Sequence, residues 1–407
     1  MQRRNFIKGG LLASSLSLKS SSSPLAPIEF TPISLAERKM RVIKAQKLMA
    51  EKQIQAIILD AGINLNYFTG INWHPSERSM LAIIPAKGDI QFICPAFEED
   101  RFLEMAPAGT KVQIWEEDEN PFALTICVLQ GIGIHAGQIG IEEFCRFFIF
   151  DGLRKSGVNY SFISADPITI PCRIIKSSAE IALMQKANDA TVKAIQAGIA
   201  ALSLGCSPRQ ISQKIAQAHA EQGTVHGFAS VTFGVATSFP HGSSRKQILK
   251  NGDVVMLDCG CSVGGYESDI TRTVVFGEPS AKQKQIWELE KKAQQAGFEA
   301  AKLGAPAENV DNAARKVLVD AGFGPDYKMP GLPHRTGHGI GMSGHEWGNM
   351  VRGNKAPLEI GMCFSIEPTI AIPGEFGVRL EDCAYMTADG PKWFTKPSPS
   401  ISEPFLM

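Results

Sequence analysis

Two aspartates flank a predicted β-hairpin in the C-terminal half of the chain. The apolar run Val254–Leu257 leads to Asp258, and the chain returns through Asp269 after a glycine pair at positions 264 and 265. Such a pair favours a two-residue hairpin turn, because that turn needs positive φ. A turn centred there pairs position i with position 529 − i, so Asp258 faces Thr271. Asp269 then shares the face of Thr271, and its backbone lies about 7 to 8 Å from that of Asp258.

A divalent cation is the simplest partner for this carboxylate pair. Two acidic groups in a poorly hydrated site raise each other's pKa, and a cation between them removes the conflict. The alternative is that Arg272 neutralises one of them and that both are solvated. The pair on its own leaves both interpretations open.

A histidine-rich segment follows. His334, His338 and His345 lie within twelve residues, among glycines that let the backbone approach closely. The Gly-His-Gly-Ile-Gly sequence around His338 offers little for a hydrophobic interior, which favours a functional role over a structural one. Glu346, directly after the third histidine, and Glu375 further on are interpreted as solvated loop charges.

Two further acids end predicted strands near the C-terminus. Glu367 follows the apolar run that begins at Cys363, and Glu381 follows Arg379 by two residues. Within one strand Arg379 and Glu381 share a face while Asp382 points away. Glu381 is therefore the better ligand candidate of the two neighbouring acids.

The candidate metal ligands are therefore one imidazole and four carboxylates: Asp258, Asp269, His338, Glu367 and Glu381. The set is too acidic for a structural zinc finger and has too many ligands for one small site. It suits two hard or borderline divalent ions bridged by carboxylates, roughly 3.5 to 4 Å apart. Such a pair would lower the pKa of a water between the ions and stabilise a developing oxyanion.

The pattern before residue 167 predicts a small α/β domain over residues 28–166. A helical period over Leu35–Lys52 leads into a strand-like run at 56–59, and further runs at 81–84 and 90–93 alternate with helical segments. The prolines from Pro167 to Pro171 predict a linker.

Residues 167–407 predict a second domain of the α+β class. Ser177 and Glu180 have capping-box spacing and open a helix. Three more helices are expected, from Pro208 to Gly223, after Ser280, and over Ala307–Ala321. Glycine-rich strands are expected at 228–233, 253–276 and 363–386. Helices in pairs around antiparallel hairpins indicate an α+β domain rather than a doubly wound sheet.

The second domain resembles the pita-bread metallopeptidases, the group of methionine aminopeptidase, aminopeptidase P and prolidase. Five motifs carry the likeness between about residues 175 and 386: Asp-x-Gly at 258–260, Gly-Tyr-x-Ser-Asp-Ile-Thr-Arg-Thr at 265–273, His-Arg-Thr-Gly-His-Gly-Ile-Gly at 334–341, Ser-Ile-Glu-Pro at 365–368 and Gly-Val-Arg-Leu-Glu-Asp at 377–382. The first domain is placed like the creatinase-type N-terminal domain of aminopeptidase P and prolidase, which methionine aminopeptidases lack. The resemblance therefore implies the branch that hydrolyses Xaa-Pro bonds.

The resemblance also implies how the metal ligands divide. Asp258 would hold one ion, Asp269 and Glu381 would bridge, and His338 and Glu367 would complete the second ion's shell. Glu367 would in addition carry the proton. Two Mn²⁺ ions are the expected cofactors, with Co²⁺ or Zn²⁺ as alternatives.

Four residues are implied to bind substrate. His241 matches the family histidine beside the scissile carbonyl, and His334 and His345 match histidines that contact substrate and stabilise the tetrahedral intermediate. Arg379 matches an arginine close to the bridging carboxylates. Thr369, where the pattern usually has glycine, and Trp347 with Gly348, where it usually continues toward proline, are departures that could reshape the pocket.

Composition sets the boundaries of this interpretation. Lys plus Arg and Asp plus Glu both number 41, so nucleic acid and anionic membranes are poor candidate partners. The nine cysteines show no C-x-x-C spacing and are expected as mostly buried, unpaired thiols. Small peptides with proline in second position are the expected partners, and the family implies a homodimer or homotetramer.

The first 27 residues resemble a twin-arginine export leader, with Arg3 and Arg4 before a short apolar stretch and a serine-rich exit. A periplasmic or exported protein is therefore expected, without a stable membrane span once the leader is removed. A disordered basic tail is the alternative.

Two other functions stay open. One is a different enzyme on the same fold, of the creatinase, ectoine hydrolase or dimethylsulfoniopropionate lyase type. Creatinase is disfavoured because it lacks the metal ligands that are intact here. The other is a catalytically inactive binding module, which the retention of all five ligand candidates disfavours.

Overall fold

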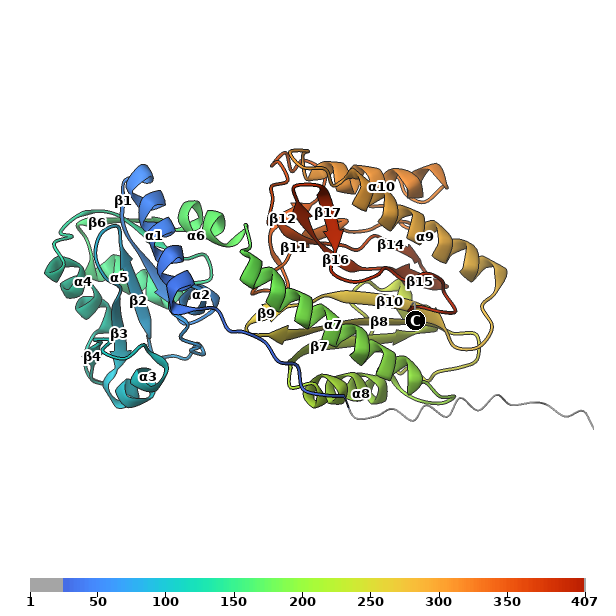
Figure 1. Ribbon diagram of the computed structural model, residues 1–407, viewed down its shortest axis with the longest axis horizontal. Helices are drawn as coiled ribbons and strands as arrows, with labels where there is room; N and C mark the ends of the chain where they lie inside the picture. Colours follow the sequence, from blue (N-terminus) through green and yellow to red (C-terminus); the bar gives the residue numbers. More distant parts are fainter. Residues whose placement is uncertain (1–24, 406–407) are drawn as a thin grey trace, which may run out of the picture.

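The computed structural model describes residues 25–405, so nearly all of the predicted leader lies outside the described residues. An N-terminal and a C-terminal domain are visible in Figure 1, with helix α6 and the start of helix α7 between them. Within residues 25–405, no helix is both long enough and apolar enough to span a bilayer. The predicted combination of an α/β domain followed by an α+β domain is confirmed.

One six-stranded mixed sheet, in the order β4-β3-β2-β1-β5-β6, forms the N-terminal domain. Its side chains alternate between two cores: α1, α2, α3 and α6 cover one face, and α4 and α5 cover the other. The strands are β1 (Ile54–Asp60), β2 (Leu81–Pro85), β3 (Gln91–Pro95), β4 (Gln113–Trp115), β5 (Gly137–Ile141) and β6 (Tyr160–Ser164). The helices are α1 (Leu35–Lys52), α2 (Ile63–Thr69), α3 (Glu99–Met105) with the 3₁₀ turn η1 (Ala96–Glu98) before it, α4 (Pro121–Gly131), α5 (Phe147–Ser156) and α6 (Asp166–Arg173).

The linker predicted between Pro167 and Pro171 is wrong, because this segment is helix α6. Pro167 lies in the first turn, where a missing N–H leaves no hydrogen bond unmade. Ile168 and Cys172 of the same helix are buried in the N-terminal core. The N-terminal domain therefore continues to the end of α6.

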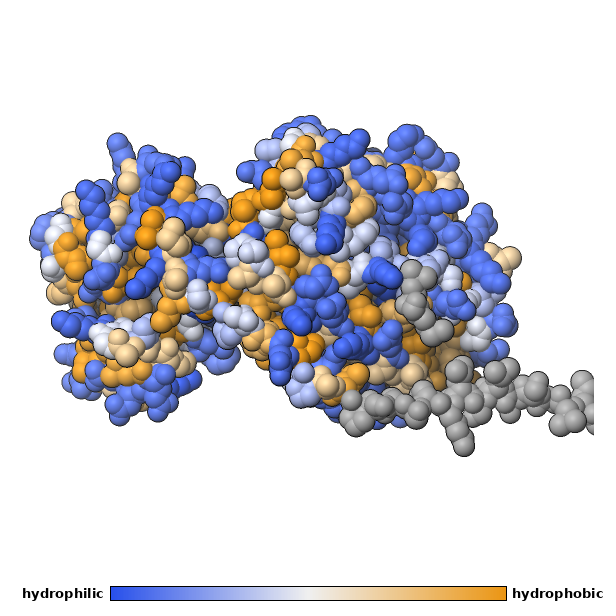
Figure 2. Space-filling model, in the orientation of Figure 1, coloured by the Kyte–Doolittle hydropathy of each residue, from blue (hydrophilic) through white to orange (hydrophobic). Residues whose placement is uncertain are grey.

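Two pairs of helices cover the C-terminal domain. Helices α7 and α8 pack against β7 and β8, and α9 and α10 pack on the opposite side against β14 and β15. The predicted capping box forms at the start of α7, and further capping boxes form at Ser207 before α8 and at Ser280 before α9. In Figure 2 the surface over α9 and α10 is mostly hydrophilic, as expected for helices with one buried face. Their bounds are α7 (Ser178–Ala200), α8 (Pro208–Glu221), α9 (Ala281–Ala300) and α10 (Glu308–Asp320).

The first sheet of this domain has the order β10-β8-β7, with β9 paired to β8. Thr271 pairs with Asp258 and Tyr266 with Val263, so the predicted register of the hairpin is confirmed. Strand β8 continues through Asp258 instead of ending there. The strands are β7 (Val225–Phe233), β8 (Val254–Val263), β9 (Tyr266–Glu267) and β10 (Ile270–Val275), and the 3₁₀ helix η2 (Gly234–Ser238) follows β7.

A five-stranded sheet, ordered β12-β11-β13-β16-β17, and the β14-β15 hairpin complete the domain. The bridge between Thr271 and Glu381 links the hairpin of the first sheet to this second half. The strands are β11 (Gly337–Gly339), β12 (Glu346–Met350), β13 (Cys363–Ile366), β14 (Thr369–Ile372), β15 (Phe376–Arg379), β16 (Asp382–Thr387) and β17 (Gly390–Trp393). All nine cysteines are free, and seven of them are buried.

Candidate metal centre

The four predicted carboxylate ligands line one cavity of 760 Å³ between the two sheets. Asp258 lies in β8 and Asp269 just before β10, while Glu367 follows β13 and Glu381 lies between β15 and β16. His338, from the middle of β11, lies against these acids with its side chain only 1% exposed. The other residues that line the cavity are Phe228, His241, His334, Arg335, Ser343, Gly344, His345 and Arg379.

Two overlapping groups of ligand atoms could each hold an ion. Asp258, Asp269 and Glu381 form one, and His338, Glu367 and Glu381 form the other, with all ligand atoms of a group within 4.8 Å of one another. Glu381 belongs to both groups, and Asp269 joins His338 in a third with His345. Nε2 of His338 lies 3.2 Å from Glu367 Oε1, 3.7 Å from Asp269 Oδ2 and 3.9 Å from Glu381 Oε1.

The His338 imidazole is arranged as a neutral ligand. Burial, together with the neighbouring His345, lowers its pKa to about 3. Its Nδ1 lies 3.1 Å from the carbonyl oxygen of Gly339, which accepts a hydrogen bond and so places the ring proton on Nδ1. The lone pair of Nε2 therefore faces the carboxylates.

Without a cation, the carboxylates are poorly accommodated. Burial and then the neighbouring acids raise the pKa of Asp269 and of Glu381 well above the usual range, and burial raises the pKa of Glu367 to about 7. Asp258 Oδ1 and Glu381 Oε1 are buried without a hydrogen-bond partner. Buried acceptors without donors are costly, and hard divalent cations bind this kind of oxygen. The residues present thus fit a cationic group that bridges them.

Arg379 and Thr271 hold the carboxylates in place. The Arg379 guanidinium pairs with Asp258 and donates from Nε to the Thr271 hydroxyl, 3.1 Å away. That hydroxyl donates to Glu381 Oε2 over 2.7 Å. Arg379 also donates to the carbonyl oxygen of Pro240 over 3.1 Å, which ties the His241 loop to the centre. Arg379 therefore lies beside the acids.

The alternative interpretation, in which Arg272 neutralises one of the two aspartates, is wrong. Arg272 is fully buried and donates instead to Asp382 over 2.7 Å. Its Nη1 donates to the carbonyl oxygen of Glu381 over 2.9 Å. Asp382 points away from the cavity, as the strand alternation predicts, and the pair supports the backbone that carries Glu381.

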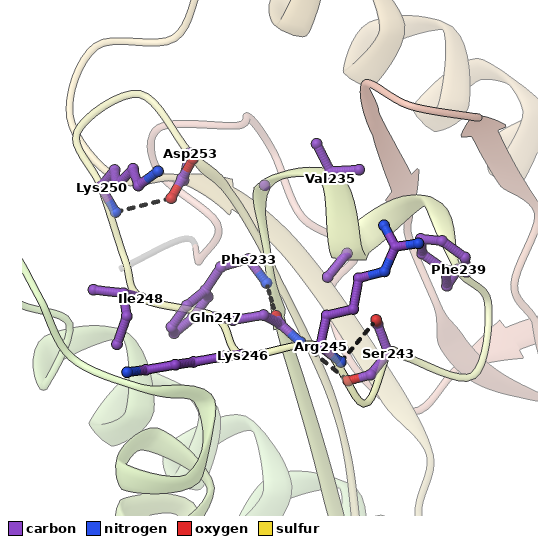
Figure 3. A pocket seen from close by; sticks show the side chains of 12 residues that line it. Phe233, Val235, Phe239, Ser243, Arg245, Lys246, Gln247, Ile248, Lys250 and Asp253 are labelled. Carbon is purple, nitrogen blue, oxygen red and sulfur yellow. Dashed lines mark hydrogen bonds between the residues drawn. The ribbon is translucent and has the colours of Figure 1, made fainter.

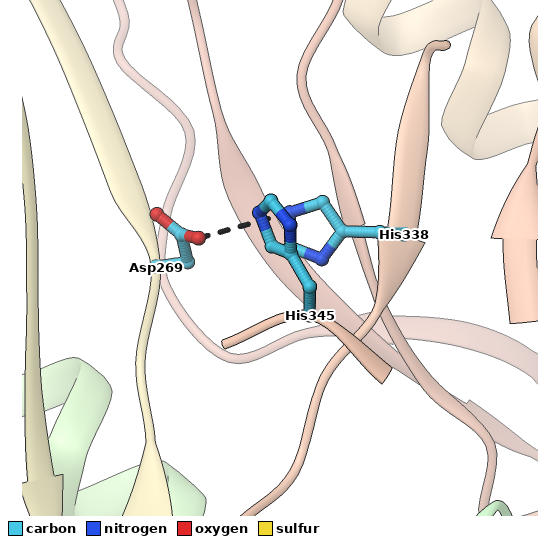
Figure 4. A group of neighbouring side chains, drawn as sticks. All are labelled: Asp269, His338 and His345. Carbon is cyan, nitrogen blue, oxygen red and sulfur yellow. Dashed lines mark ion pairs between the residues drawn. The ribbon is translucent and has the colours of Figure 1, made fainter. Parts of the chain in front are cut away.

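The three predicted substrate histidines lie on the cavity wall, but their environments differ. His241 and His345 are exposed. The ring centroids of His345 and His338 lie 4.0 Å apart. Figure 4 shows these two rings beside Asp269. His334 is half-buried, and its Nε2 lies 3.0 Å from the Thr369 hydroxyl. His345 is close enough to the Asp269–His338 pair to act as a ligand as well.

The interpretation of Glu346 as a solvated loop charge is wrong. Its side chain is 2% exposed and forms ion pairs with Arg173 and with Lys176, the latter at 2.8 Å. Strand β12 begins at Glu346 and packs this residue toward the N-terminal domain, which the sequence spacing alone did not reveal. Glu375 is exposed, as predicted, and pairs with Lys282.

Arg335 is a cavity residue that the motif analysis did not single out. Its Nη2 lies 3.2 Å from Nδ1 of His345, so a fixed positive charge stands beside an exposed histidine. Its place next to His334, inside the His-Arg-Thr-Gly-His motif, was the available signal.

A separate pocket of 400 Å³ is lined by residues from the segment between β7 and β8, including Phe239 and Ser243 (Figure 3). Phe233, Arg245, Lys246 and Asp253 are among the residues that line it. None of the five metal candidates is among its lining residues. We therefore assign the chemistry to the cavity between the sheets.

Comparison with known proteins agrees with this geometry. Residues 182–388 match the model of metallopeptidase family M24, and residues 41–175 match that of the creatinase/prolidase N-terminal domain. The chain belongs to metallopeptidase family M24. The predicted resemblance is thereby confirmed, and the chain is an enzyme of the metallopeptidase class.

Relatives of this M24 protein match over nearly their whole length. An Xaa-Pro dipeptidase from Lactobacillus helveticus is 33% identical over 361 residues, which is 88% of this chain and 96% of the relative. A prolidase structure from Thermococcus sibiricus superimposes with a TM-score of 0.81 at 30% identity, covering 88% of this chain and 97% of the other. The dipeptidase PepE from Mycobacterium ulcerans gives a TM-score of 0.84 at 29% identity, covering 91% and 99%.

Proposed function

We propose that this protein hydrolyses the bond between an N-terminal residue and proline, using two divalent cations. The observation that carries the proposal is the convergence of four carboxylates and one neutral imidazole on one cavity, with two buried carboxylate oxygens unpaired. The names of its relatives, Xaa-Pro dipeptidase and prolidase, supply the substrate class.

Asp258, Asp269, His338, Glu367 and Glu381 would hold the cations, most simply Mn²⁺, with Co²⁺ or Zn²⁺ as alternatives. Lewis-acid activation of water and of the scissile carbonyl is the chemistry that two such cations supply when bound. Arg379 and Thr271 keep the carboxylates at fixed positions, so this part of the site is preorganised before substrate arrives.

Proton transfer is assigned to Glu367. Its carboxylate lines the cavity and lies 3.2 Å from Nε2 of His338, beside the place where the cations would bind. It would take a proton from the attacking water and deliver it to the prolyl nitrogen as the bond breaks. His241 and His345, exposed at the cavity wall, would orient the scissile carbonyl and stabilise its developing negative charge.

The substrate side of the cavity suits a dipeptide with a free carboxylate. Proline at the second position has a tertiary amide and a fixed φ, so a dedicated pocket is needed to bind it. Arg335 and Arg379 bring two guanidinium groups to the cavity, and a guanidinium pairs with a carboxylate bidentately. Arg379 is occupied by Asp258, which leaves Arg335 as the better partner for the substrate carboxylate.

The deciding experiment is a rate comparison with protein loaded with Mn²⁺. We expect turnover of Ala-Pro and Gly-Pro, slower turnover of the tripeptide Ala-Pro-Ala, and no activity on ectoine or dimethylsulfoniopropionate. Two equivalents of metal per chain are expected by elemental analysis. Turnover of those small molecules without peptide cleavage, or an inert protein that binds no metal, would contradict the proposal.

We further propose that the protein is exported through its twin-arginine-like leader and assembles as a homodimer or homotetramer. Arg3→Lys together with Arg4→Lys should retain the protein in the cytoplasm, whereas a Lys8→Arg control should not. Light scattering of the purified protein measures the assembly. Unchanged export of the double variant, or a monomeric mass, would contradict the respective expectation.

A further inference from the structure

A buried polar chain connects the N-terminal domain to the cavity loop that carries His345. It begins in the N-terminal sheet, where Glu142 accepts a hydrogen bond from the backbone N–H of Asp60 over 2.6 Å and another from Asn64 Nδ2 over 2.7 Å. Asn64 Oδ1 in turn accepts from Arg173 Nη1 over 3.0 Å. Asn64 is fully buried and Arg173 is 2% exposed, so water does not screen these contacts.

Arg173 also forms an ion pair with Glu346, the first residue of β12. Lys176, at the start of the C-terminal domain, donates to the same carboxylate over 2.8 Å. Two cations from the α6–α7 junction thus fix one buried glutamate. The planar guanidinium of Arg173 contacts Asn64 and Glu346 at once, which a lysine ammonium at the end of a flexible stem does less well.

The Glu346 carboxylate then organises the backbone of the loop before it. Its Oε1 accepts from the backbone N–H groups of Met342, over 3.0 Å, and Ser343, over 3.3 Å. A Cβ at Gly341 would come within 2.7 Å of Glu346 Oε2, so the loop folds directly onto this carboxylate. The next residues, Ser343 to His345, line the catalytic cavity.

We propose that Glu346 is a positioning residue through which the N-terminal domain fixes His345 at the wall of the active site. The exposed His345 side chain contacts only the ring of His338 and Nη2 of Arg335 among the contacts described above. The backbone of its loop is held by a carboxylate whose own position depends on Arg173 and, through Asn64, on the N-terminal sheet. The expected effect on kcat/KM rests on the proposed peptidase function. The expected order of the loop backbone does not.

A buried ion-pair network can also serve only to dock two domains, and the two roles have different signatures. Removal of a docking contact lowers activity equally whether or not His345 is present. Removal of a positioning contact has its effect through His345 and disappears once that side chain is gone. A double-mutant cycle separates the two roles.

The cycle combines Asn64→Ala with His345→Ala and measures kcat/KM on Ala-Pro with Mn²⁺. Asn64→Ala should lower kcat/KM about fivefold or more in the wild-type background and less than about twofold in the His345→Ala background. Tyr67→Phe is the matched control, since Tyr67 also lies on α2 and donates to the carbonyl oxygen of Cys172 on α6, over 2.7 Å. It removes one buried hydrogen bond between the same two helices and should change kcat/KM less than about twofold in both backgrounds.

The proposal is overturned if Asn64→Ala lowers activity by the same factor in both backgrounds, or if Tyr67→Phe has an equal effect. Should Asn64→Ala fail to fold, as judged by thermal unfolding, Arg173→Lys replaces it. That variant keeps a positive charge near Glu346 but weakens the link to Asn64, and the same pattern is expected of it.

Hydrogen exchange tests the structural part without reference to activity. In Asn64→Ala the peptide that contains the Met342 and Ser343 amides should exchange faster than in the wild type, while exchange in Tyr67→Phe stays unchanged. Equal exchange in all three proteins would overturn the proposal. A wild type that shows no peptidase activity would contradict the proposed function, and the exchange result would still decide the positioning role.

Discussion

The hydroxyl of Thr369 lies 3.0 Å from Nε2 of His334, at a position where the family pattern usually has glycine. Burial lowers the pKa of the His334 ring to about 4, so the ring is neutral and carries a single proton. That proton is on Nδ1, because Nδ1 lies 2.7 Å from the carbonyl oxygen of Arg335 and donates to it. Nε2 is therefore the acceptor, and Thr369 is its donor. A glycine could not make this contact.

We predict that removal of the Thr369 hydroxyl changes substrate binding through His334. Thr369→Val retains the shape but leaves Nε2 without its donor, which should change KM for Ala-Pro by about threefold to tenfold, the equivalent of a single buried hydrogen bond. Thr369→Ser keeps the hydroxyl and is the control. Wild-type KM in the valine variant would show that this contact has no part in substrate binding.

Loss of one buried carboxylate should stabilise the metal-free protein while removing its response to metal. Asp269→Asn eliminates an acid whose pKa is raised by burial and by Asp258, so the free energy of unfolding in EDTA should rise by about 1 to 3 kcal/mol. The exposed Asp389→Asn should change it by less than about 0.5 kcal/mol. Thermal unfolding with EDTA and with Mn²⁺ makes the measurement. A destabilised metal-free variant that still gains stability from Mn²⁺ is the contrary result.

Metal affinity should increase with pH. Burial raises the pKa of Glu367 to about 7 and that of Asp269 and Glu381 well above the usual range, so the metal-free site carries protons at neutral pH. A cation must displace these protons, and the apparent affinity should fall about tenfold per pH unit for each proton displaced as the pH drops below 7. Calorimetric titration between pH 5 and 8 measures this slope. An affinity independent of pH would mean that the carboxylates are already ionised.

A pair of neighbouring histidines, the buried His219 and the partly buried His226, predicts how the free energy of unfolding depends on pH. Nδ1 of His219 lies 2.9 Å from Nδ1 of His226, and burial followed by the charge of His226 lowers the pKa of His219 to about 4. A lowered histidine pKa stabilises the fold fully above the ordinary value of 6.5, and this contribution is lost as the pH falls toward 4. Wild type should therefore lose roughly 2 to 3 kcal/mol more than His219→Gln between pH 7 and pH 4.

Urea unfolding at a series of pH values provides that comparison. His135→Gln, at an exposed position, is the matched control and should follow the wild type across the range. The metal-site carboxylates titrate in all three proteins, so their contribution cancels from the differences. Parallel pH curves for wild type and His219→Gln would argue against an acid-sensitive contribution from this pair.

Local sequence determined much of the hairpin and the helices. Two adjacent glycines fixed the turn, and the register that follows places Thr271 opposite Asp258, because strand pairing counts residues outward from a turn. The capping boxes at Ser177 and Ser280 likewise mark helix starts through bonds between near neighbours. The ligand candidates were recognisable for a related reason: acids at the ends of apolar strands need a compensating charge wherever they meet.

Only the tertiary structure decided which charges meet. Arg272 and Arg379 both lie near the acids in sequence, yet Arg272 pairs with Asp382 and Arg379 with Asp258, because the sheets bring different faces together. From the sequence, Glu346 is predicted to be a solvated loop charge. In the structure β12 places it against Arg173, which lies 173 residues earlier in the chain. Spacing specifies neighbours along one strand or helix. Contacts between elements depend on how their buried faces pack, and a single sequence does not state that packing.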